Sequence, residues 1–291
     1  MYRIQSLAIF GGLIGLFAIV GFAFFGWTGV FVILLGGVLF NSLTLGSSVR
    51  LILSLHRARP IESWEAPGLH RAAHELARRA DLPVPQLAIY PSDLPNAFAL
   101  GRGDGIIAVS TGLLKLLNIR EISGVLSHEL AHLKNRDSLL NLSAGLFVQA
   151  ISSLSTVFGI LMLLFFLSGS WIGGGENLLP VILLVTFAPY AAAALHAAFM
   201  RTRERLADQD AVLLTGDPMG LANALNKLHQ YSRYLDRLSR RFRFIYTTDT
   251  GAGPKWLRTH PDTDERIDRI LELEEKIAPY PGPRVRRIAV T

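Results

Sequence analysis

The sequence predicts a mainly α-helical membrane protein with a small β-sheet. Half of its 291 residues are hydrophobic, and the mean hydropathy is +0.35. The chain holds 29 Lys and Arg residues, yet none lies between Arg3 and Arg50 and none between Arg136 and Arg201. The long apolar runs lie in these two gaps. We therefore expect membrane-spanning helices there, with the remaining residues forming a domain outside the bilayer.

Four apolar runs predict four transmembrane helices. In the first gap, residues 7–25 and 30–49 are joined by Gly26-Trp27-Thr28-Gly29, a turn-sized connection with an interfacial Trp. In the second gap, residues 142–167 and 178–200 flank a glycine-rich loop. At about 1.5 Å per residue, each run nearly spans or spans a hydrocarbon core of roughly 30 Å. Buried core helices would keep a polar stripe, and a signal peptide would be followed by a cleavage site.

The positive charges predict the orientation. Every Lys and Arg lies before the first span, between the second and third, or after the fourth, so the positive-inside rule places these parts and both termini in the cytoplasm. Residues 1–50 and 139–200 are then two transmembrane hairpins. Residues 51–138 and 201–291 are two pieces of one cytoplasmic domain. The absence of cysteine agrees with a reducing compartment.

The first cytoplasmic piece carries signals for helices and short strands. Residues 68–81 have helical spacing of Leu and Ala, and residues 86–90 and 105–110 have the apolar character of strands in a small sheet. A further helix begins at Asn118, which suits the N-cap, while Glu121 three residues later completes a capping box. This helix should continue through the chemically informative segment that follows.

The net charge of +6 suits anionic lipid headgroups better than nucleic acid. The Arg-rich stretch 233–243 has interleaved aromatic residues but no groove-reading motif, which favours a helix facing solvent or lipid. The tail 277–291 contains three prolines, which predicts an extended end of the chain. We expect a lipid bilayer as a partner and no nucleic acid; nothing in the sequence indicates an oligomeric state.

The segment HELAH is the strongest chemical signal. On a helix it places His128 and His132 one turn apart, where both imidazoles can bind one ion at about 2.0 to 2.1 Å. Glu129 can accept the proton of a water that the ion activates, as metal-assisted amide hydrolysis requires. Histidines that only cap or pack are the alternative. A second pair, His70 and His74, has no acid between its members and lies on a predicted helix rich in Arg, so we interpret it as a surface pair.

A hydrolytic zinc site with three protein ligands needs one more donor. Glu204 and Asp208 lie one turn apart after the last span, which fits Glu204 as the third ligand and Asp208 as the group that orients a ligand. Glu121 is a poorer candidate, because it lies two turns before His128 on the same helix, roughly 10 Å along the axis. An ordinary salt-bridged helix is the alternative reading of the two acids.

Five segments share residues and order with a known family, and they are interleaved with the four spans. The segments are Asn96-Ala97-Phe98-Ala99, Val109 to Leu113, His128 to His132 with Asn135 and Asp137, Arg203-Glu204 with Ala207-Asp208, and Thr259-His260-Pro261 with Arg266-Ile267. On these segments the chain resembles the HtpX family of membrane zinc endopeptidases over nearly its entire length. Related prenyl-protein proteases share the HExxH and ExxxD elements, but four spans cannot form their larger membrane barrel.

The resemblance implies a mostly helical metalloprotease domain with a small sheet. It implies one Zn²⁺ held by His128, His132 and Glu204, with Glu129 as general base. It also implies proteolytic quality control of misfolded or damaged membrane proteins, as part of a stress response in a prokaryotic inner membrane. The substrates would be polypeptides, most of them membrane proteins.

Two further roles follow by similarity to zinc proteases. Asn96, Ala97 and Phe98 would form an edge strand that pairs with an extended substrate through main-chain hydrogen bonds. The alternative for Asn96 is a turn residue after Pro95. His260 is the candidate donor to the oxyanion, since Pro261 fixes the chain after it, although a lone histidine is as often structural.

Two other classes of function fit the sequence less well. A scaffold or channel could use zinc only to tie the two cytoplasmic pieces together, but a structural site needs no base such as Glu129 and usually has four protein ligands. A transporter would carry ionisable residues within its spans. The four runs carry no Lys, Arg, Asp or Glu in their cores, and His196 lies near one end.

Overall fold

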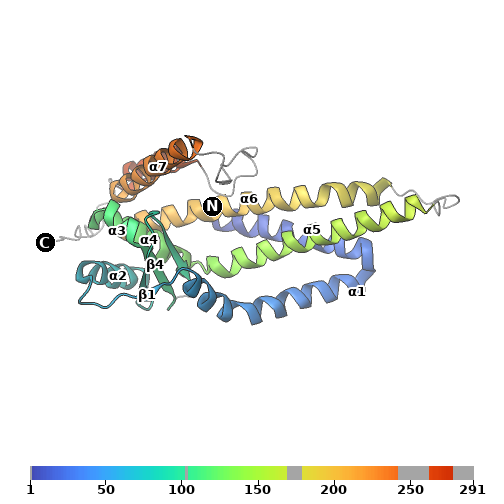
Figure 1. The fold of residues 1–291 in the computed structure, drawn as a ribbon, viewed down its shortest axis with the longest axis horizontal. Coiled ribbons are helices and arrows are strands. Elements are labelled where there is room, and N and C mark those ends of the chain that lie inside the picture. The colour runs from blue at the N-terminus through green and yellow to red at the C-terminus, as the bar shows by residue number, and fades with distance from the viewer. Residues whose placement is uncertain (1, 102–103, 169–178, 242–261, 278–291) are drawn as a thin grey trace. The chain divides into compact units, whose positions relative to one another are not determined.

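Figure 1 shows the computed structural model, which is mostly helical with one four-stranded sheet. Its elements follow in the order α1, β1, α2, β2, β3, β4, α3, α4, α5, α6, α7 and α8. A mainly α protein with a small sheet is therefore confirmed. The structure describes residues 2–101, 104–168, 179–241 and 262–277.

The described chain divides into two compact units. The first contains residues 2–44 and 139–202, and the second contains residues 45–138, 203–241 and 262–277. Each unit is assembled from segments far apart in the sequence. Two stretches of chain must therefore fold together to complete the first unit, and three to complete the second.

The first unit consists of apolar helices from α1 (Tyr2–Leu55), α5 (Asp137–Leu167) and α6 (Leu179–Thr215). Three described helices are long and apolar enough to cross a membrane, at Tyr2–Phe31, Leu140–Leu164 and Leu179–Thr215. Many of their large side chains are exposed, as lipid-facing side chains would be. Their shared core is formed by Leu13, Phe17, Val20, Ala144, Ile151, Ala188, Ala192 and Phe199.

The predicted break between the first two spans is present as an interruption within α1. Gly26 has φ 60° and ψ −155°, a conformation that favours glycine, and the α1 ribbon turns sharply part-way along its length (Figure 1). Residues 30–49 continue α1 beyond this point, but most of their side chains lie outside the described part of the chain. The span predicted over residues 30–49, the second along the chain, therefore stays a prediction.

The second unit is built around the sheet, whose strand order is β1-β2-β4-β3. The strands are β1 (Arg59–Pro60), β2 (Gln86–Tyr90), β3 (Ala97–Leu100) and β4 (Ile106–Ser110). β2 and β4 are parallel, whereas β3 pairs antiparallel with β4 and forms an edge of the sheet. The two predicted strands correspond to β2 and β4.

Helices cover both faces of this sheet. On one face, α2 (Pro67–Ala80) and α4 (Ile119–Lys134) pack on a core that includes Leu76, Ile107 and Leu126. On the other face, Leu53 near the end of α1 packs against Tyr90 and Phe98. α3 (Thr111–Leu116) follows β4 directly.

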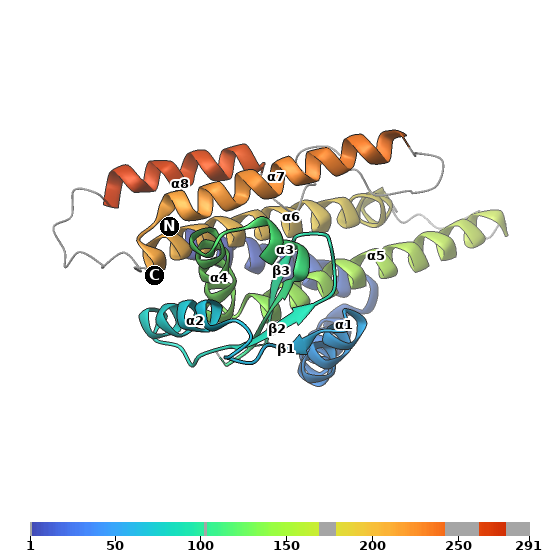
Figure 2. The ribbon, with the colours of Figure 1, turned by 60° about the vertical axis from the view of Figure 1, so that its left-hand side comes forward.

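Helix α4 is held firmly at its start. Asn118 accepts a hydrogen bond from the Glu121 backbone N–H, and the Glu121 side chain accepts one from the Asn118 backbone N–H, so the predicted capping box is confirmed. Lys227 of α7 (Pro218–Arg241) forms an ion pair with Glu121 at 2.8 Å. α7 packs against α4, and α8 (Thr263–Ile277) lies alongside α7 (Figure 2). The helix with the HELAH segment is thus anchored on several sides.

Candidate metal centre

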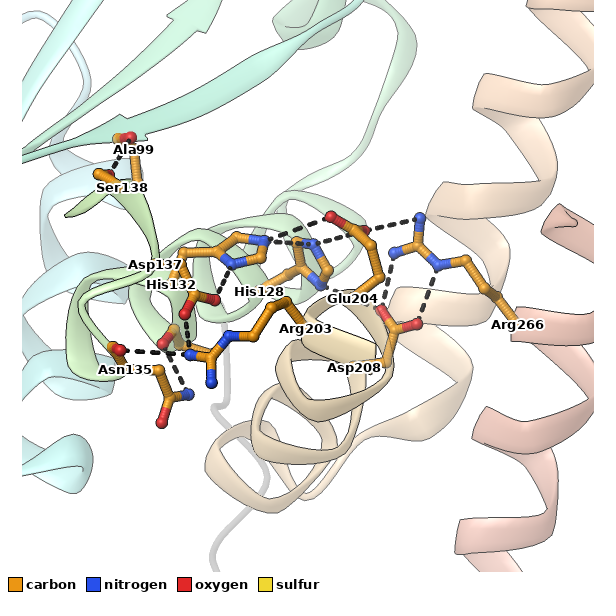
Figure 3. A network of polar contacts seen from close by, with 11 residues as sticks. Ala99, His128, His132, Asn135, Asp137, Ser138, Arg203, Glu204, Asp208 and Arg266 are labelled. Atoms are coloured by element: carbon orange, nitrogen blue, oxygen red, sulfur yellow. Dashed lines mark hydrogen bonds and ion pairs between the residues drawn. The ribbon is translucent and has the colours of Figure 1, made fainter. Parts of the chain in front are cut away.

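Two histidines of α4 and one glutamate of α6 bring their polar atoms together (Figure 3). The Nε2 atoms of His128 and His132 lie 3.1 Å apart, and the two rings are perpendicular. Glu204 places Oε2 3.6 Å from Nε2 of His128 and Oε1 3.8 Å from Nε2 of His132. One donor atom from each residue fits within 4.8 Å of the others. The three side chains expected to bind metal therefore converge.

The outer nitrogen of each imidazole faces an aspartate. Nδ1 of His128 lies 3.0 Å from Oδ1 of Asp208, and Nδ1 of His132 lies 2.6 Å from Oδ2 of Asp137. Asp208 was expected beside a ligand, whereas the sequence reasoning assigned no role to Asp137. The signal for it was its place two residues after Asn135, within the segment that resembles the family.

Each aspartate is paired in turn with an arginine. Nη2 and Nε of Arg266 donate to the two carboxylate oxygens of Asp208 at 2.7 and 2.9 Å, and Nη1 of Arg266 lies 3.4 Å from Oε2 of Glu204. Arg203 forms an ion pair with Asp137. The sequence reasoning also missed both arginines as parts of the site. Figure 3 shows two chains of contacts, His128–Asp208–Arg266 and His132–Asp137–Arg203.

These contacts favour one tautomer of each imidazole. A carboxylate only accepts hydrogen bonds, so a neutral imidazole facing one places its N–H on Nδ1. The Nε2 atoms of both histidines would then present lone pairs toward each other and toward the Glu204 carboxylate. Three acceptors this close repel one another unless a cation lies among them. The donor set therefore fits a metal ion.

The distances agree with such an ion. Two imidazole nitrogens at about 2.0 to 2.1 Å from a tetrahedral zinc would be separated by roughly 3.3 to 3.4 Å. The observed separation of the two Nε2 atoms is 3.1 Å, and the distances from Nε2 to the Glu204 oxygens are 3.6 and 3.8 Å. Side-chain shifts of a few tenths of an ångström would be enough to place all three donors around one ion.

The charges of the site also fit a divalent cation. With both imidazoles neutral, four carboxylates face two guanidinium groups, which leaves a formal charge of −2. Since such a charge is costly away from bulk water, a dication would neutralise the cluster. The carboxylates belong to Glu129, Asp137, Glu204 and Asp208, and the guanidinium groups to Arg203 and Arg266.

Without a metal, a proton on His128 supplies positive charge to the cluster. Burial alone would lower the pKa of His128, but hydrogen bonding to the Asp208 and Glu204 carboxylates outweighs burial and raises the pKa to about 10. Burial and the nearby charge of His128 together lower the pKa of His132. One of the two imidazoles thus carries a positive charge at neutral pH, and the other does not.

The remaining predicted site residues differ in how the structure places them. Glu129 is half-buried beside His128 on α4, close enough for its charge to oppose the lowering of the His132 pKa. Ala97 and Phe98 lie in β3, whereas Asn96 immediately precedes this strand. His260 lies outside the described residues, so its role as oxyanion donor stays a prediction.

Of the second histidine pair, His70 is tied to the backbone of a neighbouring segment. Its Nε2 lies 2.9 Å from the Ile61 carbonyl oxygen. This contact supports a role of His70 in the fold rather than in metal binding. In the described ranges, the group of candidate metal ligands contains neither His70 nor His74.

Comparisons with known proteins agree with this site. The profile of "Peptidase family M48" matches residues 63–274. A "Protease HtpX homolog" of Thermococcus kodakarensis is 36% identical over 285 residues, covering 92% of this chain and 94% of the relative. That of Kineococcus radiotolerans is 37% identical over 291 residues, covering 93% and 96%. The chain belongs to the HtpX family of M48 peptidases. The predicted family, and with it a membrane metalloprotease, is confirmed.

The chain also resembles solved structures, among them that of S. mikatae Ste24p. The two are 20% identical with a TM-score of 0.47. The match covers 92% of this chain and 63% of the Ste24p chain, so the HtpX chain spans less than two thirds of that protein.

The raised pKa of His128 predicts a pH-dependent metal affinity for this protein. Below that pKa, a metal must displace a proton, so the apparent zinc affinity should rise about tenfold per pH unit from pH 6 toward pH 9. At pH 7, close to one proton should be released per zinc bound. Chelator competition and calorimetry in buffers of different ionisation enthalpy measure both quantities. An affinity that stayed constant over this range would contradict the protonation of His128.

Proposed function

We propose that the chain is a membrane-anchored zinc endopeptidase in which His128, His132 and Glu204 bind the metal and Glu129 is the general base. The convergence of two imidazole Nε2 atoms and a buried carboxylate carries this proposal. Zinc bound there would acidify a water and polarise the scissile carbonyl. The group of candidate ligands contains three side chains in the described ranges, fewer than the four of a closed structural zinc site.

Glu129 supplies the proton transfers in this proposal. It directly follows His128 on α4, so its carboxylate can reach a water held beside the two imidazoles. Being half-buried, it remains accessible to a substrate. It accepts a proton from the attacking water and delivers it to the leaving amine, which completes hydrolysis of the peptide bond.

The register of the sheet supports β3 as the substrate strand. The Ser110 backbone N–H donates to the Asn96 carbonyl at 2.9 Å, and the pairs alternate from there along β3 and β4. The main-chain groups of Phe98 therefore face β4, whereas those of Ala97 and Ala99 point away from it. An extended peptide would pair with Ala97 and Ala99, because Asn96 already bonds to β4.

The position of Glu204 supports substrates at the membrane. α6 is one helix from Leu179 to Thr215, so the third ligand lies on the same helix as an apolar span. From Leu179 to Glu204 the helix rises about 38 Å, somewhat more than the roughly 30 Å hydrocarbon core. Cleavage would then occur close to the bilayer surface. We propose misfolded or damaged membrane proteins as substrates, as family resemblance suggests.

Separate substitutions of two glutamates should distinguish metal binding from catalysis. Glu129→Gln keeps all three ligands, so it should retain zinc while activity falls by at least about 10²-fold. Glu204→Ala should lose zinc and activity together. Metal analysis and cleavage of an unfolded membrane protein, with and without chelator, measure both. Near-normal turnover by zinc-loaded Glu129→Gln would contradict the role of Glu129 as general base. A stoichiometric zinc content in Glu204→Ala would show that Glu204 is not a ligand.

A proline in β3 should test substrate pairing. Ala97→Pro removes an N–H that points away from β4, so the sheet should persist while one hydrogen bond to substrate is lost. We expect kcat/KM for extended peptides to fall about 5- to 10-fold with the zinc content unchanged. Ala97→Ser, which keeps the N–H, is the matched control. Equal losses in the two variants, or none in either, would remove this strand from substrate binding.

Site-directed labelling should test the proposed topology, in which 1–50 and 139–200 are membrane hairpins of an inner membrane and 51–138 and 201–291 are cytoplasmic. The chain has no cysteine, so single cysteines can replace the exposed Thr28 and Asn226. In intact cells an impermeant thiol reagent should label Thr28→Cys, whereas Asn226→Cys should react only after lysis. The reverse pattern would place the metal centre in the opposite compartment.

A further inference from the structure

We infer that Asp137 and Arg203 form a positioning pair for His132, and that the left-handed turn at Arg136 brings Asp137 into place. The inference rests on the proposed metal site, in which His132 is a ligand. It assigns the residues that hold this imidazole in the orientation that metal binding requires. Asp208 and Arg266 act on the other histidine, from a different part of the chain.

The contacts of the pair are short and shielded from solvent. Oδ2 of Asp137 lies 2.6 Å from Nδ1 of His132, and the same carboxylate forms an ion pair with Arg203. The exposed fraction is 2% for Asp137 and 6% for Arg203. In such surroundings a hydrogen bond to a charged acceptor is strong and keeps its geometry. Nδ1 of His132 is thereby kept as the donor, which leaves Nε2 for the metal.

This contact depends on a break between α4 and α5. On a continuous α-helix, side chains five residues apart point about 140° away from each other, so Asp137 could not face His132. The chain avoids this geometry because α4 ends at Lys134, Arg136 adopts a φ of 55°, and α5 begins at Asp137. A positive φ is uncommon in a residue other than glycine. Contacts of the neighbouring residues with α6 can offset the cost of this conformation.

Arg203 and a neighbouring acid of α6 hold this turn. Nη2 of Arg203 donates to the Asn135 carbonyl at 3.2 Å, while Nδ2 of Asn135 donates to Oδ2 of Asp210 at 2.8 Å. Arg203 therefore contacts both the turn and the carboxylate that the turn presents. Arg203 also directly precedes Glu204. The residue that supports His132 and the proposed ligand Glu204 are therefore neighbours on one helix.

A double substitution distinguishes positioning from simple structural pairing. Removing either partner alone takes a compensating charge away from a buried group, so Asp137→Asn and Arg203→Gln should each lower the melting temperature. The combined variant should recover much of that loss. Its zinc affinity should nevertheless remain about 10- to 100-fold below that of the unchanged protein, because His132 still lacks its carboxylate. Full-length protein in lipid nanodiscs serves for both measurements, with zinc affinity taken from chelator competition.

Two further variants keep the test decisive if the double variant does not fold. Arg203→Lys preserves the charge beside Asp137 and should keep zinc affinity within a few-fold. Glu121→Gln removes another buried, paired carboxylate from the start of α4 and should leave zinc affinity unchanged. In Asp137→Asn saturated with Co²⁺, the visible absorption bands should shift, since they report the geometry of the ligands. Glu121→Gln should keep the unchanged spectrum.

The outcomes separate this inference from the proposed function. Failure of the unchanged protein to bind zinc stoichiometrically would refute the metal site itself. If that protein binds zinc but the double variant binds it equally well, or Asp137→Asn keeps both affinity and Co²⁺ spectrum, the pair is structural only and the positioning role is wrong.

Discussion

The close approach of two imidazole nitrogens is the constraint on which the rest of the site depends. The Nε2 atoms of His128 and His132 lie 3.1 Å apart, beside the Glu204 carboxylate and largely out of contact with solvent. Two lone pairs at this distance are tolerable only with a cation between them. Asp208 and Asp137 lie beside the far ring nitrogens and favour protons there, and an arginine offsets the charge of each aspartate. The need for a cation is thus linked to two further sets of side chains, the aspartates that contact the histidines and the arginines that pair with the aspartates.

The arrangement needs helices that do not move relative to one another within the second unit. α4 supplies both histidines, and its first turn is fixed by its own capping box and by Lys227 of α7. Its other end is fixed by contacts of Asn135 with α6. α8 supplies Arg266 and is anchored by Ile270, which is fully buried. Because the contacts of the histidines, aspartates and arginines join several helices, a small displacement of one helix would disturb several of them together.

Much of this could be predicted from the sequence because the signals are local. The spacing of His128 and His132, the Asn118 capping box and strands β2 and β4 all depend on residues a few positions apart. Glu204 was identified across a long stretch of chain because a zinc site needs a third donor and α6 offers an acid in a suitable context. The sequence alone therefore predicted a mainly helical protein with a small sheet and the three side chains that converge.

The sequence did not predict the partners that lie beyond those three side chains. Asp137 reaches His132 only through a left-handed residue in the α4–α5 connection, and nothing in the local composition requires Arg136 to adopt that conformation. Arg266 arrives from a helix separated from α7 by residues that the structure does not describe. Such contacts depend on tertiary packing. A pattern of residue types can indicate that acids and arginines are present but not which of them will meet.

The surroundings of the site favour catalysis over a purely structural metal. A structural zinc is usually enclosed by four protein ligands, whereas the candidate group in the described chain contains three and Glu129 beside it is only half-buried. β3 packs next to α4 and presents the main-chain groups of Ala97 and Ala99 away from the sheet. A partly exposed base and an edge strand beside the same helix are each unnecessary for tying two segments together. Their combination is what hydrolysis of an extended polypeptide requires.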